Sequence, residues 1–322
     1  MVVATVTTGR GTSVAVGSIN TSARGLRAVV FALLIPALLG AGLNLSCCSS
    51  SQSAEPKSIG NPFSGLSSSS QRKQVLASLP MNRLTPQARK RITSIAKSPT
   101  IYRRLPTQAI DCDRDMFLFL TRNSETLVGL WDLMGITQVQ TRRTGKYQLE
   151  AQDGAGTTCT VDLIYGDSNL HIFVADGMYD GKMTAKPIKG SGVFVLRSGY
   201  AKSASGSTTV TGTLDVFVQF HGIGTDLIVR TLSGVIGRSA DSNFTETARF
   251  IGQVSQASAK NPPAMVDVAG RLPQVDDVTK KQFAEVIAGV AARTTLPSRA
   301  AEPNVNVQPP RTAVRTLTRR TK

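Results

Sequence analysis

The sequence predicts an α+β fold in which a strand, two short helices and an antiparallel meander sheet precede a long C-terminal helix. Three observations support this order. Apolar residues alternate with polar ones from Leu214 to Phe220, the period of a half-buried strand. Beyond the joint at 221–225, apolar residues from Leu227 to Val235 recur at helical spacing. Between 137 and 220, short alternating segments are separated by turn residues, which favours an antiparallel sheet.

The strand and the two helices at the start of the domain follow from local signals. Residues 101–110 have strand character, and Pro106 marks an edge or a bend. The acids at 111–115 suit the positive N-terminal end of a short helix. They do not fit a calcium loop, because Met116 stands where such a loop requires glycine. A second helix carries one apolar stripe and ends at Gly135; the stripe consists of Leu127, Leu130, Trp131 and Met134.

The meander and the closing helix are predicted with breaks at specific residues. Strands are expected at 137–152, with a turn near Gly145, and at 157–165, 170–175, 193–199 and 208–220. Asp176-Gly177 is a turn signal that ends one of them, and a further strand at 183–189 contains Pro187 and suits an edge. The closing helix is expected to break near Gly237, because each interior glycine costs about 1 kcal/mol relative to alanine.

The chain is basic only at its ends. Residues 1–110 carry thirteen Lys or Arg and one acid, and residues 294–322 carry six Lys or Arg and one acid. Residues 111–293 carry eighteen Lys or Arg and nineteen acids. A neutral domain between basic flanks argues against nucleic-acid binding and favours contact of the flanks with an anionic surface. The expected organisation is a signal peptide or membrane anchor at 1–48, a Ser-rich and basic linker at 49–99, the α+β domain at 100–258, a helical extension at 259–293 and a disordered basic tail at 294–322. Within the linker, residues 71–79 favour a short helix, and Thr85-Pro86 is a capping signal for a helix that runs to about Lys97.

An apolar run at 28–45 follows a long, basic N-terminal region, the order of a signal peptide. The run ends in Leu45-Ser46-Cys47-Cys48, which resembles the lipobox of bacterial lipoproteins and makes Cys47 and Cys48 candidate lipidation sites. Three interpretations remain open: a cleaved signal or lipoprotein signal, an uncleaved anchor, or a cytoplasmic protein. The first two predict an exported domain at the cell membrane or in the envelope.

No catalytic or metal-binding constellation stands out in the sequence. His171 and His221 are possible general bases, but no carboxylate or nucleophile stands at a spacing that would support either. No pair of cysteines has the spacing of a zinc site. Cys112 and Cys159 fit either a disulfide or two buried thiols. We therefore expect no cofactor and no metal, and we favour a non-catalytic role over an enzyme of the cyclase type.

The order of elements over 100–258 resembles the START-like superfamily of helix-grip domains, which includes polyketide cyclases and lipid-transfer domains. The strand-to-helix segment TLDVFVQFHGIGTDLIVRTLSGVIG carries most of the resemblance. It implies a cavity between the sheet and the last helix that binds a lipid or another hydrophobic small molecule. The implied lining residues, which also fit a plain core, are Phe117, Trp131, Met134, Phe173, Phe194, Phe217 and Leu227. The alternative function is an interaction protein of the envelope, in contact with anionic membrane or wall polymer through its basic flanks.

Overall fold

The computed structural model describes residues 68–182, 186–203, 206–221 and 225–295, and residues 225–239 by their backbone alone. The helices are α1 (Ser69–Ala77), the short 3-10 helix η2 (Met81–Arg83), α2 (Pro86–Ala96), α3 (Arg114–Arg122), α4 (Ser124–Leu133), α5 (Thr225–Lys260), α6 (Pro262–Gly270) and α7 (Asp277–Thr295). The strands are β1 (Ile101–Arg104), β2 (Gln108–Asp111), β3 (Gln140–Gly145), β4 (Gln148–Gln152), β5 (Thr157–Gly166), β6 (Leu170–Tyr179), β7 (Ile188–Lys202) and β8 (Thr208–His221). The architecture is the predicted α+β type.

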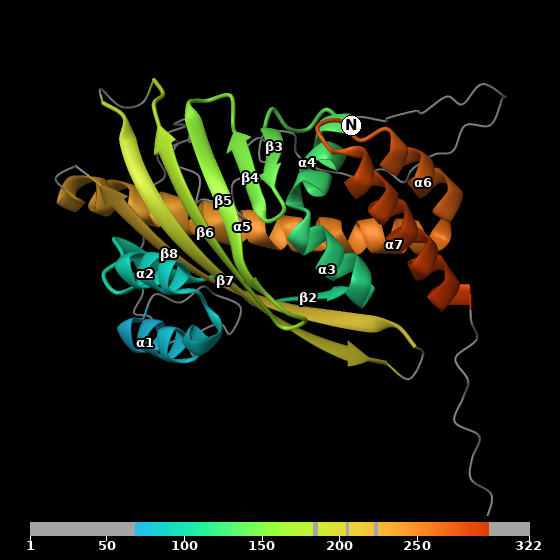
Figure 1. Cartoon of the computed structure of the whole chain (residues 1–322), viewed down its shortest axis with the longest axis horizontal. Helices are drawn as coiled ribbons and strands as arrows, with labels where there is room; N and C mark the ends of the chain where they lie inside the picture. The colour runs from blue at the N-terminus through green and yellow to red at the C-terminus, as the bar shows by residue number, and fades with distance from the viewer. Residues whose placement is uncertain (1–67, 183–185, 204–205, 222–224, 296–322) are drawn as a thin grey trace, which may run out of the picture.

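The described strands form one antiparallel sheet in the order β1-β8-β7-β6-β5-β4-β3, and β2 also pairs with β8. The longest pairing joins β7 to β8, from Lys189 opposite His221 to Lys202 opposite Thr208. Helix α5 crosses one face of the sheet, while α1 and α2 lie on the other (Figure 1). We call the face toward α3, α4 and α5 the inner face, and the face toward α1 and α2 the outer face.

Strand β8 is buried on both faces. Its even-numbered residues, such as Leu214 and Val216, belong to the inner core with α3, α4 and α5. Phe217 instead belongs to a second core on the outer face, where it packs with Ile92 and Ile95 of α2. The sequence predicted that β8 buries only one of its two faces. In the structure, alternate side chains of β8 enter two separate apolar layers, one on each face.

The described part of the predicted linker, residues 68–99, contains α1, η2 and α2, whose apolar residues pack on the outer face of the sheet. Thr85 caps α2 as predicted: its Oγ1 accepts from the backbone N–H of Ala88 at 3.2 Å, and Pro86 takes the first helical position. The few apolar residues of α1, η2 and α2 are enough to fold this segment because the outer face offers apolar partners. These partners are Ile172, Val174, Val193, Val195 and Phe217.

The entry to the inner face follows the predicted signals. Pro106 separates β1 from β2, and both strands pair with β8. Asp113 caps α3, its carboxylate accepting from the backbone N–H groups of Asp115 at 2.9 Å and Met116 at 3.2 Å. Gly135, with φ of 69°, follows α4 in a conformation that suits glycine.

Three predicted breaks are absent. Strand β6 continues through Asp176 and Gly177 to Tyr179, because ladders to β5 and β7 hold it on both sides. Strand β7 runs as a single element over 188–202, where the sequence predicted two. Helix α5 passes through Gly237 without a break over 36 residues. One unfavourable residue of about 1 kcal/mol does not interrupt a helix that continues on both sides.

The segment 259–293 docks on the inner-face helices. Phe283 of α7 stacks on Phe119 of α3 with ring centroids 5.4 Å apart. Arg293, near the end of α7, donates from Nε to a carboxylate oxygen of Asp113 at 2.8 Å. Ile287 is fully buried in the same core. The α6–α7 segment therefore shares one hydrophobic core with α3 and α5.

The outer face contains one fully buried carboxylate, that of Asp215 on β8. Arg104 on β1 donates to both of its oxygens, from Nε and Nη2, each at 2.9 Å. Tyr102 donates its hydroxyl to Oδ1 at 2.8 Å, and burial next to this carboxylate raises the pKa of Tyr102. A charge that is fully removed from water needs such partners, since an unpaired one strongly destabilises the fold.

Removing the guanidinium should therefore cost far more than removing a surface pair. Arg104→Met should lower the free energy of unfolding by about 3–5 kcal/mol, because Asp215 stays buried without its counter-charge. The measurement is urea unfolding followed by circular dichroism. Arg142→Met is the matched control: Arg142 pairs across two strands with Glu150, both are exposed, and the loss should be under about 1 kcal/mol. If both variants lost the same small amount of unfolding free energy, the Arg104–Asp215 pair would not be a buried ion pair.

Candidate functional site

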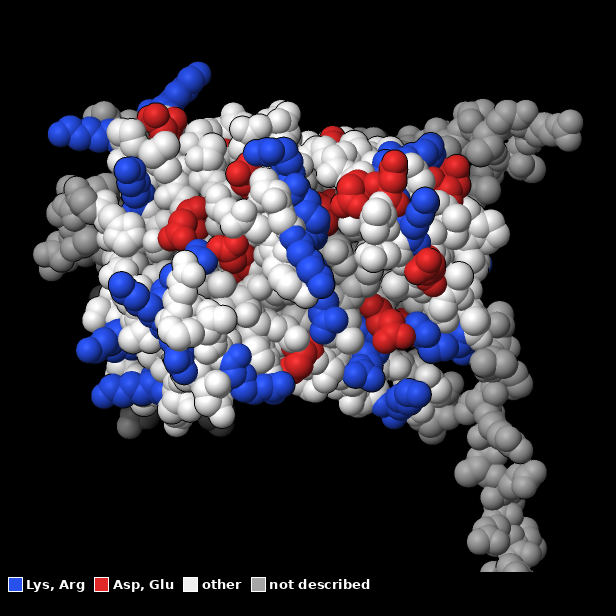
Figure 2. Space-filling model, in the orientation of Figure 1, with Lys and Arg blue, Asp and Glu red and all other residues white. Residues whose placement is uncertain are grey.

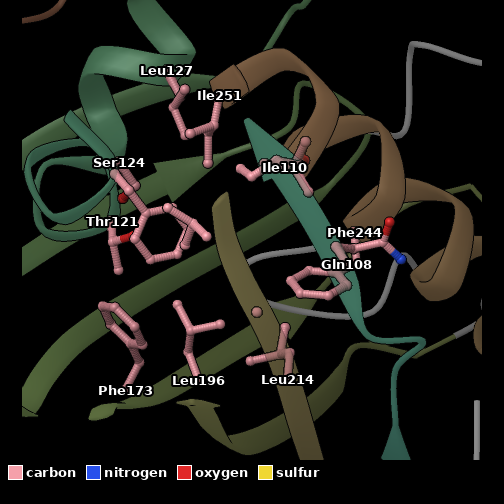
Figure 3. A pocket seen from close by; sticks show the side chains of 15 residues that line it. Gln108, Ile110, Thr121, Ser124, Leu127, Phe173, Leu196, Leu214, Phe244 and Ile251 are labelled. Atoms are coloured by element: carbon pink, nitrogen blue, oxygen red, sulfur yellow. The ribbon is translucent and has the colours of Figure 1, made fainter. Parts of the chain in front are cut away.

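A cavity lies between the inner face of the sheet and helix α5. In Figure 3, Phe173, Leu196 and Leu214 project from the strands toward side chains of α3, α4, β2 and α5. Eleven of its fifteen lining residues are apolar or glycine, and four are polar. The lining consists of Gln108, Ile110, Phe117, Thr121, Ser124, Leu127, Phe173, Leu196, Val210, Gly212, Leu214, Phe244, Thr247, Ala248 and Ile251.

Each wall of the cavity comes from a simple periodicity. On β8, Val210, Gly212 and Leu214 alternate onto the inner face. On α5, Phe244, Ala248 and Ile251 recur at spacings of four and three, so they share one side of the helix. The helix approaches β2 closely beside this wall, since a Cβ added at Gly252 would lie 3.3 Å from the backbone oxygen of Asp111.

The cavity is small. Its volume is about 40 Å³, where a single water needs about 10–15 Å³. It has room for a few atoms only, while sites that enclose drug-sized molecules measure about 300–1,000 Å³. A larger ligand would have to displace side chains of the walls, or helix α5 itself.

One side of the cavity is polar. Thr121 and Ser124, at the junction of α3 and α4, place their hydroxyl groups near the cavity (Figure 3). Gln108 of β2 and Thr247 of α5 complete the polar lining. The side chain of Thr247 is almost completely buried, and its Oγ1 has no hydrogen-bond partner among the described residues. A buried hydroxyl without a partner is costly, so this group marks an unsatisfied position on the wall.

The structure brings together two of the seven predicted lining residues. Phe117 and Phe173 line the cavity. Phe194 and Trp131 are buried in the inner core but do not line it. Met134 lies at the end of α4 and is 40% exposed.

Phe217 points away from the cavity, onto the outer face, where its ring centroid is 4.9 Å from that of Tyr102. The side chain of Leu227 and the candidate lipidation sites Cys47 and Cys48 lie outside the described residues. No helix among the described residues is long and apolar enough to span a bilayer. The apolar run at 28–45 is not part of that range.

The lining residues that the sequence analysis missed carried a usable signal. The even-numbered residues of β8 face the side that α5 covers. The predicted lining residue Phe217 belongs instead to the odd-numbered residues of β8, which face α2. The apolar side of α5 was visible at Phe244, Ala248 and Ile251. The polar lining residues, such as Thr121 and Gln108, carry no such pattern, because only the packing of separate elements brings them together.

Neither histidine is arranged for acid–base catalysis. His171 is fully buried, and its Nε2 accepts a hydrogen bond from Nε of Arg122 at 3.1 Å. Burial, with a smaller contribution from Arg122, lowers the pKa of His171 to about 4, so the ring is neutral at pH 7. His221 lies at the exposed end of β8, where its Nε2 is 3.0 Å from Oγ of Ser191. Neither ring lines the cavity.

The thiols of the described residues are unpaired and buried. Cys112 and Cys159 are both free, which answers the question of a disulfide between them. Burial raises the pKa of each to about 12, so both are neutral thiols at pH 7 and poor nucleophiles. Across the described ranges, no group of His, Cys, Asp and Glu is arranged to hold a metal ion.

The chain has no match among protein-family models, and no curated protein matches it in sequence. Solved structures are similar at low scores. A conserved protein from Geobacillus kaustophilus aligns with 47% of this chain and 93% of its own, at 8% identity and a TM-score of 0.34. Ara h 8.0201 aligns with 44% of this chain and 96% of its own, at 10% identity and a TM-score of 0.25. The di-domain ARO/CYC BexL from the BE-7585A biosynthetic pathway aligns with 50% of this chain and 55% of its own, at 15% identity and a TM-score of 0.25.

Similarities at this level carry no argument about function, and the fold rests on the topology itself. Along the chain, β1 and β2 are followed by α3 and α4, then by the antiparallel strands β3 to β8, and then by the long helix α5. This is the element order on which the helix-grip resemblance is based.

The buried neutral histidine predicts a defined acid sensitivity. Between pH 6.5 and pH 4 the unfolded chain binds a proton at this ring that the folded chain does not, so stability falls as the pH falls through this window. The loss is on the order of 3 kcal/mol and is complete near pH 4. Urea unfolding of wild type and His171→Gln across this range should show a shallower dependence in the variant. His221→Gln, on the exposed residue, is the control and should keep the wild-type slope. Parallel profiles for wild type and His171→Gln would overturn the assignment.

Proposed function

We propose that the chain is a non-catalytic module that binds a small, mainly apolar molecule in the cavity under α5. The observation that carries the proposal is the cavity itself, an apolar space with a few convergent polar groups between a sheet and a long helix. The chemistry of the described residues favours binding over catalysis. Both buried thiols are protonated at pH 7, and His171 is neutral and lies away from the cavity.

The volume of the cavity restricts the ligand. At about 40 Å³, the closed form accepts a small group rather than a lipid chain. A lipid, the larger candidate that the helix-grip resemblance implies, would enter only if α5 moved away from β2 and β8. A compact ligand or a small ring would therefore displace the walls of the cavity less than a lipid would.

Gly212 provides a way to close the cavity without damaging the fold. A Cβ added at this position would meet Leu196 and Phe244 at 3.9 Å, an ordinary contact distance. Gly212→Ala should therefore fill part of the cavity and weaken binding of toluene at least about tenfold, with stability unchanged or raised. Phe244→Leu should enlarge the cavity and tighten binding. The measurement is calorimetric titration of the purified full-length chain with toluene.

Gly199→Ala is the matched control, since it adds the same methyl group on β7 into open space. It should leave toluene binding unchanged. Binding that survives Gly212→Ala would place the probe elsewhere. Binding confined to Phe244→Leu would mean that the native cavity is plain core, and either result would sink the proposal.

We propose a second candidate, contact of the chain with an anionic membrane at which its N-terminal region tethers it. The observation that favours it is the charge of α1, η2 and α2: residues 68–99 contain seven Lys or Arg and no acid. Figure 2 shows basic side chains gathered over these helices at the lower left. In this proposal the apolar run at 28–45 is a signal or anchor that leads to export, with Cys47 or Cys48 as the site of lipidation in the lipoprotein form.

Most of this basic surface is not neutralised within the protein. Arg91 is the exception, because it bridges Asp162 at 2.7 Å and Asp176 at 2.8 Å on the outer face. Arg89, Lys90 and Lys97 are exposed, and no salt bridge to an acid is found for them within the described part of the chain. The 23 residues at 46–68 separate the apolar run from α1. A flexible linker of this length reaches about 25 Å, so in this proposal these cations stay close to the bilayer that holds the run.

Neutralising this surface should weaken membrane binding. The triple variant Arg89→Gln, Lys90→Gln and Lys97→Gln should lose affinity for phosphatidylglycerol-containing vesicles, since each basic residue near such a surface contributes about 1 kcal/mol. The control changes the same charge elsewhere, at Lys146, Lys260 and Lys281, and should bind as wild type. Sedimentation with vesicles at low and high salt measures both. Equal binding by the two triple variants would contradict a specific surface.

A further inference from the structure

We infer that the hydroxyl of Thr247 selects for a ligand that carries a hydroxyl or carbonyl group on a compact apolar body. This inference rests on the proposed binding function and names the chemistry of the ligand. Its basis is the coincidence of two independent properties at one residue. Thr247 lines the cavity, and its Oγ1 is a buried polar atom that lacks a partner among the described residues.

Two other hydroxyl groups of α5, those of Thr245 and Ser258, are satisfied within the helix. Thr245 donates from Oγ1 to the backbone oxygen of Asp241 at 2.9 Å, and Ser258 donates to that of Val254 at 2.8 Å. This bond to the carbonyl four residues earlier is the usual solution for a helical Ser or Thr. Thr247, which belongs to the cavity wall, does not make this bond, and its Oγ1 has no partner among the described residues.

Thr247 differs from the other buried polar atoms without a partner. These belong to Glu125, Thr126, Thr141, His171 and Ser198, and none of these residues lines the cavity. Thr121, Ser124 and Gln108 add further polar groups to the lining. The cavity thus has an apolar body and a polar side, which matches a ligand with one hydrogen-bonding group rather than a hydrocarbon.

The expected selectivity follows from the cost of an unpaired buried group. A ligand oxygen that pairs with Thr247 replaces an unsatisfied hydroxyl by a hydrogen bond, whereas a methyl group at the same place leaves it unsatisfied. A site that contains such a group discriminates against analogues that cannot bond to it. Phenol and toluene form a suitable pair of probes, because they share a ring and differ in a hydroxyl against a methyl group of similar size.

The test is calorimetric titration of the full-length chain with phenol and with toluene. Wild type should bind phenol more tightly than toluene. Thr247→Val keeps the shape of the side chain and removes the hydroxyl, so phenol affinity should fall about tenfold, the effect of one hydrogen bond, while toluene affinity stays or rises. Without ligand, this variant should melt at a higher temperature than wild type, since the unpaired group is gone.

Two controls separate hydrogen bonding from structural damage. Thr247→Ser keeps a hydroxyl and should keep the preference for phenol. Thr245→Val removes a neighbouring hydroxyl that bonds within the helix, and it should leave the ratio of the two affinities unchanged. Equal losses of phenol and toluene in Thr247→Val, or no loss, would overturn the inference and leave the binding function standing. Failure of both probes to bind wild type would overturn the binding function and this inference with it.

Discussion

The rest of the structure depends on the burial of strand β8 on both faces. Its inner residues, such as Leu214, need cover from α5, and its outer residues, such as Phe217, need cover from α2. An antiparallel sheet often leaves one face in water, but a strand with apolar side chains on both sides cannot. The basic segment with α1 and α2 covers the outer face of β8, and the long helix α5 covers its inner face. Both segments therefore bury apolar side chains of the same strand.

Burial on the outer face also explains the ion pairs there. Asp215 sits in the row of β8 that also carries Phe217, so a charge lies inside an apolar layer and must be paired by Arg104 and Tyr102. Arg91 brings α2 onto the carboxylates of Asp162 and Asp176. Charge complementarity thus orients a segment whose apolar face is thin. The cations that this docking does not use remain on the surface, and they give one side of a nearly neutral domain its basic character.

Local signals predicted the elements well, and long-range packing decided what the sequence analysis missed. The caps at Thr85 and Asp113, the bend at Pro106 and the stop at Gly135 depend on neighbours in the chain, and the structure confirms them. The turn at Asp176-Gly177 and the break at Gly237 were wrong, because adjacent strands and a continuing helix override local preference. The two faces of β8 look alike in sequence, so only the position of α5 shows that Leu214 lines the cavity and Phe217 does not.

The cavity is not forced by the packing of its walls. At Gly212 the backbone would accept a methyl group at 3.9 Å from Leu196 and Phe244, so an alanine would fill space that the glycine leaves open. A glycine inside a strand weakens that strand, and an unpaired hydroxyl at Thr247 weakens the helix that covers it. Both features reduce stability, both lie on the same cavity, and an alanine and a valine of ordinary geometry would remove them. In the proposed function, the space beside Gly212 and the hydroxyl of Thr247 are the two features that a small ligand with one polar group would use.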